Sequence, residues 1–108
     1  MTIPTATPGD VTPQTYLLDV REDDEWVAGH IPGATHIPMS GLLDRVAEVP
    51  KDGDVVVVCK VGARSAQVAA YLRQQGWDNV RNLDGGVVEW VRAGRDLTTD
   101  DGTPPAIR

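Results

Sequence analysis

The segment DVVVVC, residues 54–59, constrains the fold of this chain more than any other part of the sequence. Valine is β-branched and favours strands, and a run of valines without polar alternation is typical of a strand covered on both faces. Such strands belong to parallel sheets, whose strands are connected through helices. The segment therefore predicts a central parallel strand that ends at Cys59.

Segments that favour strands and helices alternate on both sides of this valine run. The predicted elements are strands over 15–20 and 79–83, and helices over 21–26, 41–49 with Ser40 as cap, 65–75 with Ser65 as cap, and 87–93. This alternation predicts an α/β fold, a mostly parallel central sheet with helices on both faces. Ligands of such sheets bind beyond the carboxyl ends of the strands, which is where Cys59 is expected.

The length of 108 residues fits one small domain, which we place at 10–97. Residues 1–9 are proline- and threonine-rich without a clear period, and we expect a flexible N-terminal arm there, with a short strand around 10–12. Residues 98–108 are polar and proline-rich, which predicts a surface tail.

The charge balance and the cysteine count narrow the classes of function. A net charge of -6 argues against binding to nucleic acid or to an anionic membrane surface. The first ten residues lack the pattern of a signal peptide, and no apolar run approaches the length of a membrane span, so we expect a soluble, cytoplasmic monomer. One cysteine and two histidines leave no internal disulfide and predict no metal site.

The loop that follows Cys59 carries the features of a reactive thiol. It contains Lys60, Gly62 and Arg64 and leads into a predicted helix, whose free N–H groups point back at the loop. Gly62 can adopt the positive φ that a tight loop needs, and the N–H groups, together with the two cations, favour a thiolate and an anionic ligand. The alternative is that Cys59 is one more buried core residue, since free cysteine is commonly buried.

Four segments together resemble single-domain sulfurtransferases of the rhodanese type over nearly all of residues 10–95. They are LLDVREDDEW, AGHIPGATHIP, VVVVCKVGARSAQVAAYLRQQGW and VRNLDGGVVEW. The resemblance implies a rhodanese-like three-layer fold and a six-residue loop, Cys59 to Arg64, that cradles the substrate. It makes Cys59 the catalytic residue and assigns substrate binding to Lys60, Val61, Gly62, Ala63, Arg64 and Ser65.

The activity implied by the resemblance is thiosulfate sulfurtransfer by double displacement through a persulfide of Cys59, without metal or organic cofactor. The expected partners are a small anionic sulfur donor and a thiophilic acceptor, which is cyanide, a thiol or a protein. The loop CKVGAR matches neither the CRKGVT type of the thiosulfate enzymes nor the CGSGVT type of the mercaptopyruvate enzymes. Its two cations favour a dianionic donor such as thiosulfate.

Two alternatives belong to other functional classes. The first is a non-catalytic interaction module or a persulfide relay that serves one partner protein. The second is a phosphatase or arsenate reductase, and the loop length disfavours it. Related phosphatases use Cys-x5-Arg, whereas Cys59 and Arg64 form Cys-x4-Arg, a ring better matched to a sulfur atom than to a phosphate ester.

Several other polar and aromatic residues have structural interpretations. We expect Asp19 and Arg21 to support the site as an ion pair at the end of the first predicted strand, and the acidic run Glu22–Glu25 to be a solvated helix start. The remaining expectations are structural hydrogen bonds for His30 and His36, a turn beside the site for Asp84, Gly85 and Gly86, and packing roles for Trp26, Trp77 and Trp90.

Overall fold

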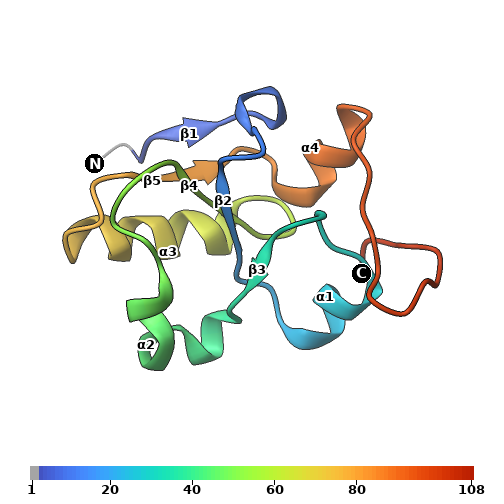
Figure 1. Cartoon of the computed structure of the whole chain (residues 1–108), viewed down its shortest axis with the longest axis horizontal. Helices are drawn as coiled ribbons and strands as arrows, with labels where there is room; N and C mark the ends of the chain where they lie inside the picture. Colours follow the sequence, from blue (N-terminus) through green and yellow to red (C-terminus); the bar gives the residue numbers. More distant parts are fainter. Residues whose placement is uncertain (1–2) are drawn as a thin grey trace.

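Five parallel strands form one sheet in the computed structural model, which describes residues 3–108 (Figure 1). The strand order is β1-β5-β4-β2-β3. The strands are β1 (Thr5–Ala6), β2 (Tyr16–Asp19), β3 (Thr35–His36), β4 (Val55–Val58) and β5 (Val80–Leu83). The predicted α/β class is confirmed, and every strand pair is parallel.

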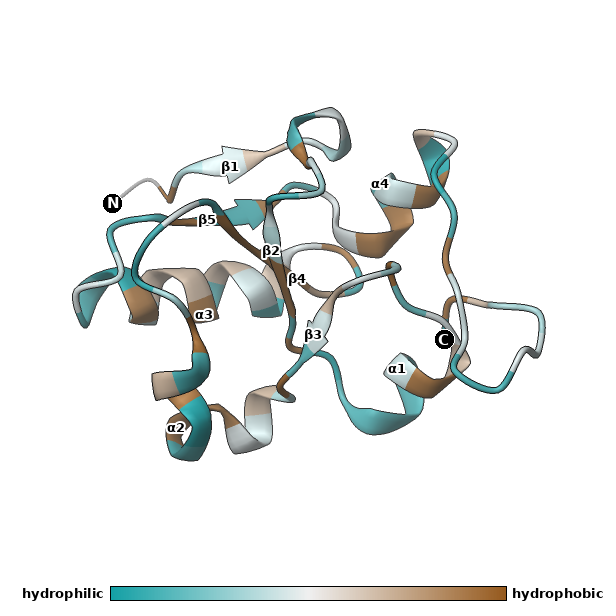
Figure 2. Cartoon of the chain, in the orientation of Figure 1, coloured by the Kyte–Doolittle hydropathy of each residue, from teal (hydrophilic) through white to brown (hydrophobic). Residues whose placement is uncertain are grey.

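The valines of β4 occupy the centre of the sheet, and all four are fully buried. Val55 and Val57 point to the face that also holds Val68 and Leu72, whereas Val56 and Val58 point to the opposite face. Figure 2 shows β4 as a uniformly hydrophobic strand. The prediction of a strand covered on both faces is therefore confirmed.

Four α-helices connect or cover the strands. They are α1 (Asp23–Ala28), α2 (Leu42–Arg45), α3 (Ala63–Gln74) and α4 (Gly86–Arg92). Figure 1 shows α2 and α3 on one side of the molecule, with α4 and the C-terminal segment on the other. Among residues 3–108, no helix has the length and apolar character that crossing a membrane requires.

The predicted flexible arm over 1–9 is wrong for the residues that the structure describes; residues 1 and 2 lie outside them. Strand β1 pairs with β5 at the edge of the sheet, and Ala6 is buried. The strand expected around 10–12 is absent there, because Pro8–Asp10 forms the 3-10 helix η1. A capping box between Thr7 and Asp10 stabilises its first turn.

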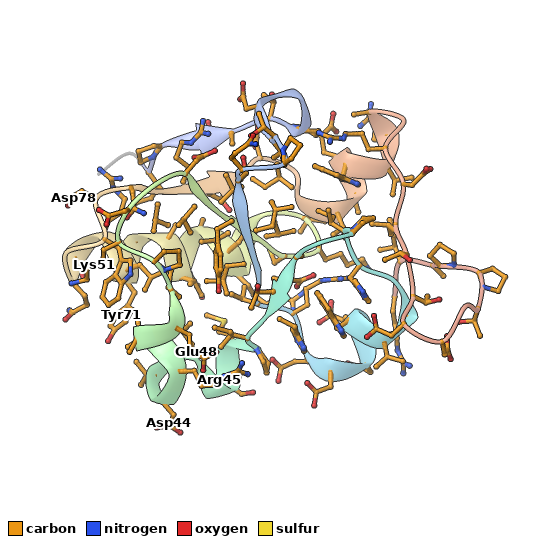
Figure 3. All side chains as sticks on the ribbon, in the orientation of Figure 1. Asp44, Arg45, Glu48, Lys51, Tyr71 and Asp78 are labelled. Atoms are coloured by element: carbon orange, nitrogen blue, oxygen red, sulfur yellow. The ribbon has the colours of Figure 1, made fainter. Side chains whose placement is uncertain are left out.

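The continuous helix predicted over 41–49 is also wrong. The segment consists of the 3-10 helix η2 (Met39–Gly41), α2, and the 3-10 helix η3 (Val46–Glu48). Ser40 caps none of them, and its hydroxyl donates to Glu22 Oε1 at 3.0 Å. Figure 3 shows the polar side chains of this segment, Asp44, Arg45 and Glu48, at the periphery of the molecule.

The C-terminal segment is exposed as predicted, but it is attached to the domain. Thr98 and His30 exchange backbone hydrogen bonds of 2.8 and 3.0 Å, and Ala106 N–H donates to Ala28 O at 2.9 Å. A Cβ at Gly29 would come within 2.6 Å of Ala106 O, so glycine allows the tail to lie against the end of α1.

Candidate active site

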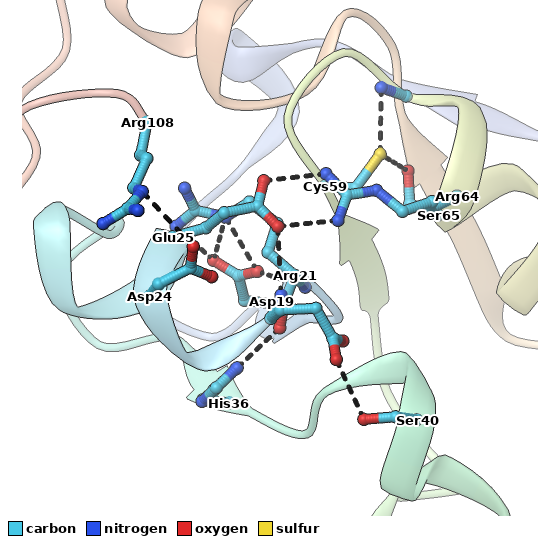
Figure 4. Close-up of polar contacts among 12 residues, drawn as sticks. Asp19, Arg21, Asp24, Glu25, His36, Ser40, Cys59, Arg64, Ser65 and Arg108 are labelled. Atoms are coloured by element: carbon cyan, nitrogen blue, oxygen red, sulfur yellow. Dashed lines mark hydrogen bonds and ion pairs between the residues drawn. The ribbon is translucent and has the colours of Figure 1, made fainter.

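Cys59 follows β4 directly, at the carboxyl edge of the sheet, and only 1% of its surface is exposed. Its Sγ accepts a hydrogen bond from Gly62 N–H at 3.0 Å and another from the Ser65 hydroxyl at 3.2 Å. Figure 4 shows both contacts converging on the sulfur. The residue is therefore part of the core, as the structural interpretation proposed, while its sulfur is surrounded by donors that suit an anion.

These donors shift the acidity of the thiol. Burial raises the pKa of Cys59, but hydrogen bonds from the Ser65 hydroxyl and from the N–H groups of Ser65, Gly62 and Val61 lower it more, so the pKa lies below its ordinary value. Each of these hydrogen bonds favours the thiolate over the thiol. A nucleophilic sulfur is thus favoured by the loop backbone and by Ser65.

Gly62 gives the loop its shape. Its φ of 106° lies in the left-handed region, and it is the N-cap residue of α3. The helix therefore begins at Ala63, and the prediction that Ser65 caps it is wrong. Ser65 lies in the first turn, fully buried, where its hydroxyl reaches the sulfur.

The start of α4 holds the other side of the loop. Val87 N–H donates to Cys59 O at 2.9 Å, and Val88 N–H donates to Lys60 O at 3.2 Å. Gly86 permits this approach, since a Cβ there would come within 2.3 Å of Cys59 O. The turn predicted over 84–86 thus lies beside the site, and the helix that follows it fixes the carbonyl groups of Cys59 and Lys60.

The remaining side chains of the predicted loop lie at its outer surface. Lys60 is partly exposed, Ala63 is exposed, and the Val61 side chain is 58% exposed. These side chains are therefore at least partly open to solvent, while the backbone of the same residues forms the loop itself.

Arg64, the second loop cation, is bound to a carboxylate from another element. Its Nη1 and Nη2 donate to Glu25 Oε1 and Oε2 at 2.7 and 2.8 Å, and Figure 4 shows the two groups facing each other. The Glu25 side chain is only 14% exposed, and the Arg64 hydrogen bonds lower its pKa to about 2. The same pair raises the pKa of Arg64. The expectation of a solvated acidic run is therefore wrong for Glu25.

Asp19 and Arg21 form a second ion pair next to the first, and both side chains are buried. Arg21 Nε and Nη2 donate to the Asp19 carboxylate at 2.8–3.1 Å, and Nη2 also donates to Gly29 O at 2.8 Å. The pair ties the end of β2 to the end of α1, which confirms the structural interpretation. The positive charge of Arg21 also contributes to the low pKa of Glu25.

The two histidines make structural hydrogen bonds, as expected. His30 Nδ1 lies 2.9 Å from Trp26 O, and His36 Nε2 lies 2.7 Å from Arg21 O. Both rings stack on the Trp26 indole, with centroid distances of 3.6 and 4.8 Å. Trp26 thus packs within this stack, while Trp77 and Trp90 are buried in the core.

Sequence reasoning missed two residues of the site, Glu25 and Asn82. Asn82 is buried in β5, and its Nδ2 donates to Gly62 O at 3.2 Å, so this side chain connects the loop to the neighbouring strand. The sequence gives no clear signal for Asn82, because Arg81 beside it in β5 is polar as well. Glu25 lies 39 residues from Arg64, and no local pattern reports such a contact.

Comparisons with known proteins agree with this geometry. Residues 7–93 match the family model described as a rhodanese-like domain. A sulfurtransferase of Allochromatium vinosum is 44% identical over 91 residues, which cover 84% of this chain and 85% of that protein.

Two solved structures are similar in fold. A rhodanese-related protein from Thermoplasma volcanium superposes with a TM-score of 0.84 at 28% identity, covering 90% of this chain and 99% of the other. A thiosulfate sulfurtransferase from Pseudomonas aeruginosa gives a TM-score of 0.79 at 29% identity, covering 98% of this chain and 22% of the other.

Proposed function

The chain belongs to the rhodanese-like family, and from that premise we propose that it transfers sulfane sulfur through a persulfide of Cys59. The observation that carries this proposal is the pair of donors on the sulfur: Gly62 N–H at 3.0 Å and the Ser65 hydroxyl at 3.2 Å. Donors that stabilise a thiolate can equally stabilise the outer sulfur of a persulfide anion.

The first half-reaction loads the enzyme. The Cys59 thiolate attacks the sulfane sulfur of the donor, a new S–S bond forms, and the bond between that sulfur and the rest of the donor breaks. With thiosulfate the leaving group is sulfite, which keeps the electron pair of the broken bond. Because Cys59 is almost completely buried, the small terminal sulfur of a donor suits the site better than a bulky group.

The second half-reaction regenerates the thiolate. A thiophilic acceptor attacks the outer sulfur of the persulfide, and Cys59 leaves as the thiolate that the loop already stabilises. Cyanide serves as acceptor in an assay, giving thiocyanate. A small thiol or a protein thiol is the proposed acceptor in the cell, and the exposed rim that includes Val61 is where it would approach.

The same geometry disfavours phosphatase or arsenate reductase activity. A phosphate-binding loop uses its terminal arginine to contact the oxyanion, and here both terminal nitrogens of Arg64 bond to Glu25. The loop is also one residue shorter than Cys-x5-Arg.

Intact-mass measurement tests the proposal. The protein is incubated with thiosulfate or, separately, with cysteine persulfide, and cyanide is then added. We expect a gain of one sulfur atom that is absent in the Cys59→Ser variant and is removed by cyanide with release of thiocyanate. If neither donor loads Cys59, the proposal is wrong and the domain is an interaction module.

A further inference from the structure

The ion pair between Glu25 and Arg64 bears on which donor the site prefers. The expectation of a dianionic donor rested on two loop cations, Lys60 and Arg64, acting together on the substrate. In the structure one of these cations makes a bidentate bond to a carboxylate, at 2.7 and 2.8 Å. The charge that the loop presents to a donor is therefore smaller than the sequence implies.

Glu25 is held in a position that favours this pairing. Its Oε1 also accepts the N–H of Glu22 at 3.1 Å in the capping box of α1, so the carboxylate is fixed by its own helix as well as by Arg64. Only 14% of the Glu25 side chain is exposed, against 36% for Arg64. A fixed, mostly buried carboxylate offsets the Arg64 charge more than a mobile, solvated one would.

The neighbouring charges add little to compensate. Asp19 and Arg21 also form a neutral pair, with both side chains buried. Among the charged residues described above at the carboxyl edge of the sheet, Lys60 is the loop cation that is not paired with a fixed carboxylate. Its side chain is partly exposed. A thiosulfate dianion approaching the Cys59 thiolate brings three negative charges together, which such a site opposes.

We propose that Glu25 is a specificity-determining residue, which neutralises Arg64 and so selects hydropersulfide donors over dianionic donors. The inference rests on the proposed function, because it concerns the donor of the same persulfide. The thiolate attacks the outer sulfur of R–S–SH, the new bond joins Cys59 Sγ to that sulfur, and the S–S bond of the donor breaks. The thiolate RS⁻ leaves, and the proton stays on the transferred sulfur, so one negative charge is present before and after the step.

The test compares the rates at which thiosulfate and cysteine persulfide load Cys59, measured by intact mass at neutral pH. Glu25→Gln keeps the shape of the side chain and removes its charge. Releasing the Arg64 charge toward the site should raise the ratio of thiosulfate to persulfide loading by about tenfold. The thiosulfate rate of the variant should also fall more steeply with added salt than that of the native protein.

A matched control lies at the other end of β4. Asp54 forms an ion pair with Arg81 at 2.9 Å, and the two side chains are 35% and 30% exposed. Asp54→Asn therefore removes one carboxylate from a comparable pair that is remote from the loop, and the ratio should stay within about twofold of the native value.

A double variant separates electrostatics from positioning. In an Arg64→Gln background, Glu25→Gln should no longer change the ratio, because the charge that Glu25 offsets is gone. A tenfold change that persists in that background would contradict the proposal. An unchanged loading ratio in the Glu25→Gln single variant would also contradict it, provided that the unfolding temperature of the variant equals that of the native protein. Failure of both donors to load Cys59 would instead overturn the proposed function, so the two failures are distinguishable.

Discussion

The two edges of the sheet use polar side chains in different ways. At the amino-terminal edge, before β4 and β5, these side chains hold turns. Asn79 Nδ2 donates to Pro50 O and Gly53 O at 3.1 and 3.0 Å, and Arg81 binds the Asp54 carboxylate. Figure 3 shows Lys51 and Asp78 at this end of the molecule. The side-chain donors of Asn79 and Arg81 thus pair with acceptors in the neighbouring turns.

At the carboxyl-terminal edge several donors share one acceptor, the sulfur of Cys59. The Gly62 N–H and the Ser65 hydroxyl both point at it. The two ends of the same valine strand thus lie in different environments: one holds turns, and the other directs hydrogen-bond donors at the buried sulfur of Cys59. The difference shows that the short loops at each end of β4, rather than the strand itself, determine the polar environment that each end provides.

The largest effect is expected from breaking the buried pair at the carboxyl edge. Asp19→Asn leaves the Arg21 guanidinium buried without its counter-charge, and we expect a loss of about 3–5 kcal/mol in the free energy of unfolding. The comparable change at the amino edge, Asp54→Asn, affects a partly exposed pair and should lose about 1 kcal/mol or less. Urea unfolding of both variants measures the difference, and equal losses would contradict this comparison.

The next effect concerns two glycines with positive φ, one at each edge. Gly86→Ala would place a Cβ within 2.3 Å of Cys59 O, so we expect a loss of about 2–4 kcal/mol and a displaced loop with slower sulfur loading. At the amino edge, Gly53 has nothing within 4 Å of the added Cβ, and Gly53→Ala should lose only about 1 kcal/mol through its φ of 80°. Thermal unfolding and the sulfur-loading assay, applied to both glycine variants, measure these effects. A Gly86→Ala variant that loads sulfur at the native rate would show that α4 does not shape the loop.

The central strand and the position of the loop that follows it could be predicted because their signals are local. Four consecutive valines identify β4, and the residues that follow Cys59 carry the loop. The start of α3 was placed two residues late, since serine is a common N-cap and the pattern does not show that Gly62, with positive φ, takes this role. Strand β1 is two residues long, too short to give a period, and only its pairing with β5 defines it.

The contacts that tune the site are not local and could not be predicted in this way. Glu25 and Arg64 are brought together by the order of the strands, because β2 and β4 are neighbours and their following segments meet at one edge. The role of Ser65 depended on where the helix begins. The capping role predicted for Ser65 is wrong because the helix begins two residues earlier, and this position in the first turn is what brings its hydroxyl to the sulfur.

A smaller effect is expected for the hydroxyl on the sulfur. Ser65→Ala removes one donor that lowers the pKa of Cys59, so that pKa should rise, and sulfur loading at neutral pH should slow by about fivefold, the value of one hydrogen bond. At the amino edge, the Thr15 hydroxyl donates to Asp54 Oδ2 at 3.0 Å, and Thr15→Val should leave the thiol unchanged. The pH dependence of thiolate absorbance measures the shift; an unchanged profile in Ser65→Ala would remove this donor from the site.

The smallest effect links the Glu25–Arg64 pair to acid stability. Arg64 lowers the pKa of Glu25 from 4.5 to about 2, so the pair's contribution is fully present above pH 4.5 and is lost as the pH falls toward 2. Solvent screens a pair whose arginine is 36% exposed, so the contribution should not exceed about 1 kcal/mol. Glu25→Gln should therefore lose less unfolding free energy than the native protein between neutral pH and pH 3, in parallel urea titrations. Identical losses would mean that Glu25 pairs equally well in the unfolded chain. The loading ratio would then be the one remaining test of whether Glu25 offsets the charge of Arg64.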